Sequence, residues 1–262
     1  MVGDIKHIVV IQSLFDEDKK TGAELYNDTI RMQIEYMQAQ NIKMTHSFHN
    51  VEDKEALIEI LKYYGANSPY IQGGIVIHLE IHGLENLEGL ILKNRSIINW
   101  EEVSDLFREI NINTCNKLYV TMATCYGRYL YKGVDPKKKS PYSGYISASQ
   151  EVTTGEVMED FTLLFQSLIE SSNLVKSYLE LEEKGSNFYY KDSERIFEEN
   201  FQSVRAKLLI DKNLKNEILK EAIEESKRAG KPIPDEEMGN YIFEKALLDI
   251  YNLHSNAFKF DC

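Results

Sequence analysis

The stretches IVIHLEIHG (Ile75–Gly83) and LYVTMATCYG (Leu118–Gly127) decide the fold. Each begins as an apolar, β-branched run and ends in small or chemically reactive residues. Such runs are typical of strands that are buried on both faces of a sheet, and we expect strands here over Gly74–Ile81 and Lys117–Thr124. A further run of this kind, Lys6–Ser13, lies near the N-terminus. Because amphipathic stretches of ten or more residues separate the runs, we expect right-handed βαβ units and a parallel sheet.

The remaining pattern completes an α/β domain. Further strands are predicted at Met44–His49 and Ser143–Ser149, with a small hairpin between Leu90–Leu92 and Ser96–Ile98. Helical spacing of apolar residues predicts helices over Ala23–Gln40, Glu52–Tyr64, Trp100–Ile110 and Thr154–Glu170. Asn99 is the expected N-cap of the third helix.

Beyond residue 172 the sequence contains no convincing strand. Three further helices are predicted there, over Asp192–Ile210, Leu214–Ala229 and Asp235–Leu253. We therefore expect two parts: an α/β domain over residues 1–172 and an α-helical extension over residues 173–262.

The composition restricts the possible partners. The 262 residues include 30 basic and 42 acidic side chains, which gives a net charge of −12. This balance argues against binding to nucleic acid or to an anionic membrane surface. We find neither an apolar run of about 20 residues nor a secretory signal. The three cysteines, Cys115, Cys125 and Cys262, form no CxxC motif, so we expect a reducing cytoplasm and no disulfide framework.

A histidine and a cysteine lie where the two quoted runs end. Carboxyl ends of neighbouring parallel strands meet at one edge of a sheet, so His82 and Cys125 can lie close together despite the 43 positions between them. A thiol beside a base is the arrangement needed for nucleophilic catalysis. Each residue alone could equally be a buried structural group. Gly83 and Gly127 favour the catalytic interpretation, because glycine lets main-chain amides approach a substrate carbonyl closely.

The segment HLEIH also suggests a zinc site, because His78 and His82 are four residues apart. On a helix this spacing would put both imidazoles on one face. The flanking residues indicate a strand, where four steps separate the two histidines by roughly 13 Å, too far for one metal ion. We therefore expect no metal site, and expect His78 to be packed or hydrogen-bonded within the strand.

The motifs together resemble the caspase-like cysteine peptidases of clan CD, and are closest to their bacterial and CHAT-type branch. That family has an apolar strand, His-Gly, a hairpin, a helix, a second apolar strand and Ala-Cys-x-Gly. The similarity extends over about residues 5–170 in element order, with the specific motifs within 75–127. It implies that His82 is the catalytic histidine and Cys125 the nucleophile, and that the main-chain amides of Gly83 and Cys125 form the oxyanion hole. Thr124 departs from the family pattern, which usually has alanine there.

The resemblance leaves substrate specificity less defined. Caspases that cut after Asp use arginines from the loop after the first strand and from the strand after the nucleophile. Here that loop carries Asp16 and Asp18, and the fifth strand leads to Glu151 without an arginine. We therefore expect Asp16, Asp18 and Glu151 to form an acidic pocket for a substrate Lys or Arg. The alternative is that all three are solvated loop residues.

Lys132–Tyr142 (KGVDPKKKSPY) takes the position of the processing linker in caspases. Its prolines and lysines predict an exposed loop. Whether this loop is autoprocessed stays open. Asp135 is a poor cleavage site because Pro136 follows it, and Lys137–Lys139 are better candidates for a cut.

The sequence therefore predicts a cytoplasmic cysteine endopeptidase that acts on a protein or peptide without a metal or cofactor. The resemblance implies a regulated effector in bacterial antiphage defence or programmed cell death. Residues 173–262 are expected to regulate it, through a small-molecule or protein activator or through a homo-oligomer. One alternative is a non-catalytic signalling module that binds a nucleotide or a partner, and another is a different thiol-dependent hydrolase or transferase. Neither a GxGxxG nor a P-loop motif is present.

Overall fold

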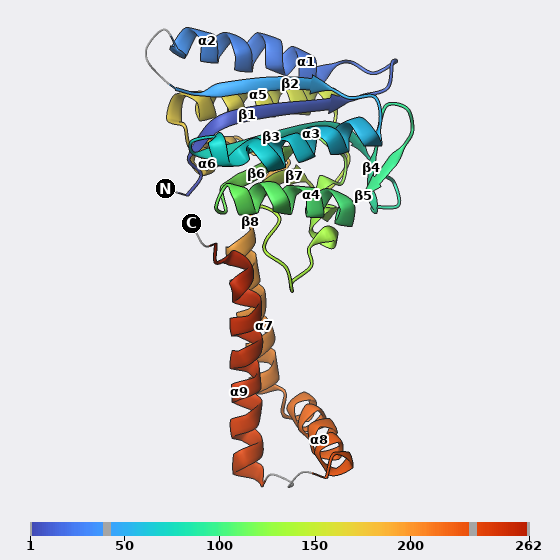
Figure 1. The fold of residues 1–262 in the computed structure, drawn as a ribbon, viewed down its shortest axis with the longest axis vertical. Coiled ribbons are helices and arrows are strands. Elements are labelled where there is room, and N and C mark those ends of the chain that lie inside the picture. The colour runs from blue at the N-terminus through green and yellow to red at the C-terminus, as the bar shows by residue number, and fades with distance from the viewer. Residues whose placement is uncertain (1, 39–42, 231–234, 261–262) are drawn as a thin grey trace. The chain divides into compact units, whose positions relative to one another are not determined.

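The computed structural model describes residues 2–38, 43–230 and 235–260, and it divides into two compact units (Figure 1). The sheet unit comprises the described residues up to Ser193, together with Phe260. The helical unit comprises Glu194–Lys259. Each unit is described separately below.

A single mixed sheet forms the centre of the sheet unit. Its main path follows the order β2-β1-β3-β6-β7-β8. These strands are β1 (Ile5–Ser13), β2 (Thr45–Asn50), β3 (Gly74–Gly83), β6 (Leu118–Met122), β7 (Gly144–Ala148) and β8 (Phe188–Asp192). All neighbouring pairs are parallel except β7 and β8, which are antiparallel. The hairpin of β4 (Gly89–Ile91) and β5 (Ile97–Asn99) pairs with the end of β3.

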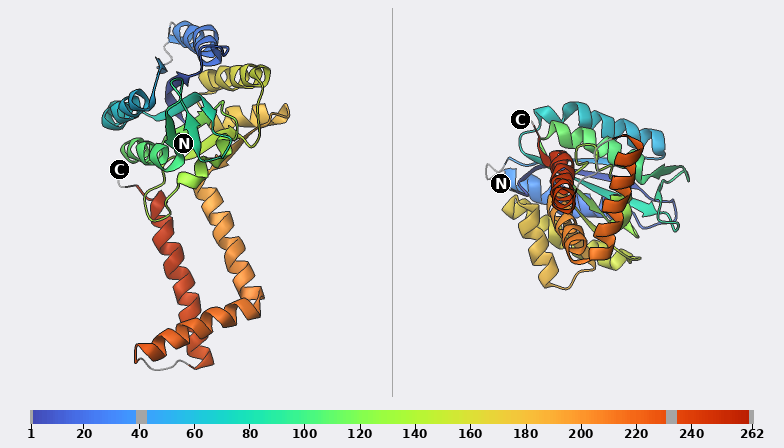
Figure 2. Two further views of the ribbon diagram at one scale, coloured as in Figure 1. Left: turned by 90° about the vertical axis from the view of Figure 1, so that its right-hand side faces the viewer. Right: turned by 90° about the horizontal axis from the view of Figure 1, so that it is seen from below.

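Helices cover both faces of this sheet (Figure 2). One face packs against α3 (Lys54–Asn67) and α4 (Trp100–Asn113). The other packs against α1 (Thr21–Leu25), α2 (Met32–Gln38), α5 (Thr154–Ser171) and α6 (Leu174–Glu183), together with the π-helical turn Tyr26–Arg31 between α1 and α2. Alternate residues of one strand enter opposite cores: Val9 and Ile11 face α3, whereas Ile8 and Val10 face α5. The predicted α/β class with a mostly parallel sheet is confirmed.

Capping side chains fix where the helices begin. The Asn99 side chain accepts the main-chain N–H of Glu102, and the Glu102 side chain accepts the main-chain N–H of Asn99. This confirms the predicted N-cap of α4. Thr153 and Glu156 form the same reciprocal pair at the start of α5. The helix expected over Ala23–Gln40 is divided by the π-helical turn, and its last two residues lie outside the described part of the chain.

The sheet unit continues past residue 172, where we predicted that it would end. Helix α6 buries Leu174, Tyr178 and Leu181, and β8 extends the sheet as an edge strand. Phe188 of β8 is fully buried and packs edge-on against Phe161 at a centroid distance of 4.7 Å. The boundary therefore lies near Ser193. An edge strand with polar residues on its exposed face lacks the continuous apolar run that identified the central strands.

The helical unit contains α7 (Ser193–Ile210, which begins in the sheet unit), α8 (Lys212–Arg228) and α9 (Glu236–Ser255). These are the three helices predicted for the extension. Aromatic rings of α7 and α9 pack together, including Phe201 against Tyr251 at 4.9 Å. Several large apolar side chains stay exposed, among them Ile210, Tyr241 and Leu253. Within the described residues, no helix has both the length and the apolar character that a membrane crossing requires.

Candidate active site

Cys125 lies in a sharp turn directly after β6. Its neighbour Tyr126 has a left-handed backbone with φ of 59°. The amides of the next two residues are engaged, since Tyr126 N–H donates to the Gln150 carbonyl at 3.2 Å and Gly127 N–H to the Thr124 carbonyl at 3.1 Å. Within the described residues, no group accepts a hydrogen bond from Cys125 N–H. The turn thus leaves the amide of Cys125 available to a ligand, beside a half-buried thiol.

His82 lies at the end of β3, the strand that pairs in parallel with β6. Two contacts hold the ends of these strands together. The buried hydroxyl of Thr124 donates to the Ile81 carbonyl at 2.8 Å. The Cα of Gly83 packs against the carbonyl of Cys125. The threonine that departs from the alanine of the resembling family therefore links the two segments that carry His82 and Cys125.

One cavity of about 120 Å³ is lined by both His82 and Cys125. Its wall also includes Asp18, Lys19 and the buried carboxylate of Glu80. The sheet topology accounts for this arrangement, because β1, β3 and β6 are parallel neighbours whose carboxyl ends share one edge. The predicted dyad residues are thus brought to one cavity, although they are far apart in the sequence.

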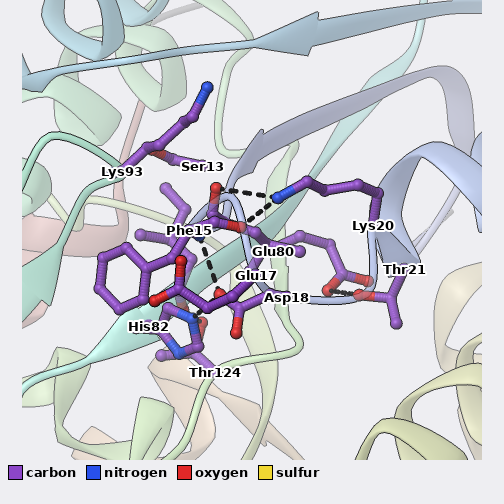
Figure 3. Close-up of polar contacts among 12 residues, drawn as sticks. Ser13, Phe15, Glu17, Asp18, Lys20, Thr21, Glu80, His82, Lys93 and Thr124 are labelled. Atoms are coloured by element: carbon purple, nitrogen blue, oxygen red, sulfur yellow. Dashed lines mark hydrogen bonds and ion pairs between the residues drawn. The ribbon is translucent and has the colours of Figure 1, made fainter.

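The loop after β1 holds the His82 ring (Figure 3). Asp18 Oδ2 lies 2.7 Å from His82 Nε2. The ring of Phe15 stacks on the imidazole with centroids 4.6 Å apart and an interplanar angle of 19°. The guanidinium of Arg95, from the β4–β5 turn, covers the Phe15 ring at 3.5 Å. Two residues of the loop after β1 therefore contact the imidazole, and the β4–β5 turn covers one of them.

Glu80 is a residue of this cavity that the sequence analysis did not identify. Thr21 Oγ1 donates to its carboxylate at 2.7 Å, and His78 Nε2 lies 3.2 Å from the other oxygen. His78 is buried and also contacts Thr121 Oγ1 at 2.9 Å. This matches the expectation that His78 is a hydrogen-bonded strand residue. Glu80 could have been identified from the sequence, because a single acidic residue within an apolar strand indicates a buried carboxylate with polar partners.

The three acidic residues predicted as one substrate pocket do not line a common cavity. Asp18 lines the cavity but contacts His82. Asp16 is highly exposed and pairs with Lys93 at 3.1 Å. Glu151 lies 3.4 Å from the hydroxyl of Tyr126, and its charge raises the pKa of that phenol. The structure does not bring together the acidic pocket that we expected.

A second cavity, of about 260 Å³, lies on the opposite side of β6, toward the β8 edge. It is lined by Arg128, Ser147, Ser149, Tyr189 and Lys191. Arg128 is three residues after Cys125, and Ser147 packs close to Gly127. Two cations, three hydroxyl groups and no carboxylate make this lining suitable for an anionic group.

The loop predicted at Lys132–Tyr142 is attached to α4 near both of its ends. Gly133 packs against the carbonyl of Trp100. Further along, Arg108 Nε donates to the Lys139 carbonyl at 2.7 Å and Asn111 Nδ2 to the Ser140 carbonyl at 2.8 Å. Residues 134–138 between these contacts are mostly exposed. Only the middle of this loop therefore fits the prediction of an exposed segment.

Cys115 has no free thiol that could act as a nucleophile. Cys115 is disulfide-bonded, which the sequence analysis did not predict, and Cys262 lies outside the described residues. In the described part of the chain, no group of three or more His, Cys, Asp or Glu side chains is arranged to hold a metal ion. No protein-family model matches the chain, and no curated protein matches it significantly.

Proposed function

We propose that this chain is a caspase-like cysteine endopeptidase in which His82 and Cys125 form the catalytic dyad. The proposal depends above all on one observation: both residues line the same cavity, at the carboxyl ends of the parallel neighbours β3 and β6. The unengaged amide of Cys125 adds support, because a peptidase needs a hydrogen-bond donor for the oxyanion. The resemblance of the His-Gly and Cys-x-Gly motifs to that peptidase family points in the same direction.

The proposed reaction begins when the sulfur of Cys125 attacks the scissile carbonyl carbon and the thiol proton moves to His82. The carbonyl electron pair moves to oxygen, where the amides of Cys125 and Gly83 donate hydrogen bonds. The imidazolium then protonates the leaving amine as the C–N bond breaks. Water, losing a proton to His82, attacks the thioester. The C–S bond then breaks, the acid is released, and the Cys125 thiol is restored with the proton that His82 holds. Every proton in this scheme passes through His82, so the scheme requires neither a metal nor an organic cofactor.

The biological setting follows from the resemblance and is part of the proposal. It is a cytoplasmic effector in bacterial antiphage defence or programmed cell death, acting on a protein or peptide substrate. We infer that the helical extension regulates it, through a small-molecule or protein activator or through a homo-oligomer. The exposed Ile210, Tyr241 and Leu253 side chains support a binding role for the helical unit.

A peptidyl acyloxymethyl ketone, which alkylates activated thiols, tests the dyad. We expect it to label wild-type protein once, at Cys125, in intact-mass and peptide-mapping measurements. Cleavage of a fluorogenic peptide should fall to background in Cys125→Ala and nearly as far in His82→Ala. Because the two groups act as a unit, the double variant should lose little more than Cys125→Ala.

The matched control is His49→Ala, which removes a histidine from β2, away from the cavity, and should leave cleavage unchanged apart from any change in stability. Circular dichroism establishes that each variant is folded. Full peptide cleavage by Cys125→Ala, or labelling that is unaffected by His82→Ala, would overturn the proposal.

A further inference from the structure

Asp18 is the only acidic side chain in contact with His82 among the described residues, and its carboxylate is itself fixed. The oxygen that faces His82 Nε2 at 2.7 Å, Oδ2, also accepts the main-chain N–H of Phe15 at 2.8 Å. The Asp18 N–H donates back to the Phe15 carbonyl at 3.1 Å. The Lys20 ammonium donates to the carbonyls of Leu14 and Phe15 and closes the loop. The carboxylate therefore has a defined position relative to the imidazole.

This contact determines which nitrogen of His82 carries the proton. An oxygen that already accepts an amide N–H behaves as an acceptor, and an ionised carboxylate has no proton to donate. His82 Nε2 must therefore be the donor in the 2.7 Å contact. In the neutral imidazole the lone pair that can take a proton is then on Nδ1.

The ring is also held against rotation. Phe15 stacks on one face of the imidazole, and Arg95 covers the far side of the Phe15 ring. Arg95 is in turn paired with Glu17 at 3.6 Å. With Nε2 bonded to Asp18 and the ring plane fixed by Phe15, a flip of the imidazole would break the charge-assisted bond. Nδ1 therefore stays on the edge of the ring that faces away from Asp18.

We propose that Asp18 is a positioning residue that keeps His82 in the Nε2–H form, so that Nδ1 accepts the Cys125 thiol proton. This inference rests on the proposed peptidase function and reassigns Asp18, which the sequence analysis placed in a substrate pocket. When Nδ1 is protonated, Asp18 also stabilises the imidazolium by its negative charge. The residue acts through His82 and makes no contact with the reacting atoms.

Steady-state kinetics of Asp18→Asn and Asp18→Glu test this role on a peptide that the wild-type protein cleaves. Asparagine keeps the size of the side chain but removes the charge and can donate a hydrogen bond to Nε2, which favours the wrong tautomer. We expect kcat to fall by about 10²- to 10⁴-fold in Asp18→Asn with little change in KM. Asp18→Glu should recover part of that loss. Asp16→Asn, in the same loop but highly exposed, is the matched control and should keep wild-type kcat.

A spectroscopic measurement tests the inference without a substrate. In protein labelled with ¹⁵N-histidine, the His82 signals, assigned by their absence in His82→Gln, should show a protonated Nε2 and an unprotonated Nδ1. Asp18→Asn should shift this pattern toward Nδ1–H. Wild-type kcat in Asp18→Asn while Cys125→Ala is inactive would overturn the positioning role and leave the peptidase proposal intact. An Nδ1–H form of His82 in the wild-type protein would likewise overturn it.

Discussion

A methyl group on the Cα of Gly83 would lie 2.1 Å from the carbonyl oxygen of Cys125. Real side chains do not approach a main-chain oxygen that closely, so the strand end that carries His82 and the turn that carries Cys125 can pack together only with glycine at this position. The requirement is steric, because the backbone of Gly83 is not in the left-handed region.

Gly83→Ala is therefore expected to push apart the two segments that carry His82 and Cys125. We expect the free energy of unfolding to fall by about 2 kcal/mol or more, because the backbone must move. We also expect peptide cleavage by the folded variant to be reduced. Gly155→Ala is the control, since an added Cβ there meets only Thr153 Oγ1 at 3.9 Å. Alanine at that helical position should stabilise the protein slightly. Wild-type cleavage and thermal midpoint in Gly83→Ala would contradict the close packing.

Acid should destabilise the protein through histidines near the β2 edge. Burial lowers the pKa of His7 to about 4, and the nearby His46 and His49 add to the effect. Between about pH 6.5 and pH 4 the unfolded chain binds a proton that folded His7 does not, so stability falls as the pH falls. Lowering the pH from 7 to 5 should therefore reduce the free energy of unfolding by about 2 kcal/mol through this histidine alone.

Urea unfolding at the two pH values measures this difference. In His7→Gln, the difference in free energy of unfolding between pH 7 and pH 5 should shrink by that amount. Identical pH dependence in wild type and variant would show that His7 is protonated in the folded protein as readily as in the unfolded chain.

The charge of the second cavity predicts which substrates are preferred. Arg128 and Lys191 line it without a carboxylate, and Arg128 is close to Cys125 in the chain. We therefore expect acidic residues to be accepted near the cleaved bond, contrary to the Lys or Arg preference that the sequence suggested. Arg128→Gln should reduce cleavage of the best acidic peptide by about tenfold, the equivalent of about 1.4 kcal/mol.

Lys132→Gln is the control for this experiment, because Lys132 is an exposed cation of the same segment that does not line the cavity. Its peptide preference should equal that of the wild type. A peptide library in which Lys or Arg is clearly favoured at every position flanking the cleaved bond would contradict the assignment of this cavity.

The central strands were predictable because they are continuous apolar runs. The meeting of His82 and Cys125 at one edge of the sheet was predictable because each residue lies where such a run ends. The bounds expected for β1, β3 and α4 agree with the structure to within about three residues. The contact of Asp18 with His82 was not predictable, since it joins positions 64 residues apart and depends on how one loop folds. The π-helical turn at Tyr26–Arg31 was also missed, because apolar spacing does not specify which carbonyl each amide bonds to.

Helix α6 and β8 were missed for different reasons. The helix has a sequence signal in its N-cap, Asn173, and in the buried Leu174, Tyr178 and Leu181 at helical spacing. Strand β8 is five residues long and half-exposed, and its identity depends on pairing with β7, which no local pattern encodes.

The position of the domain boundary can be tested by truncation. A chain ending at Ser193 keeps α6 and β8, whereas one ending at residue 172 uncovers the core around Phe161. Loss of the buried Phe188 alone should cost about 3–5 kcal/mol. We expect the longer chain to show a cooperative thermal transition and the shorter one to aggregate. Equal thermal midpoints for both would show that the sheet does not need its last strand.

The attachment of residues 132–142 to α4 affects how a cut in this loop would be detected. Lys137 and Lys138 lie in the exposed middle of the loop, and contacts from Arg108 and Asn111 hold the chain on its far side. Tryptic cleavage there should give two bands on a denaturing gel. The same sample should elute from a gel-filtration column as one particle of unchanged size, because β6 and β7 remain paired across the cut. Separation of the pieces on that column would show that the sheet depends on an unbroken chain.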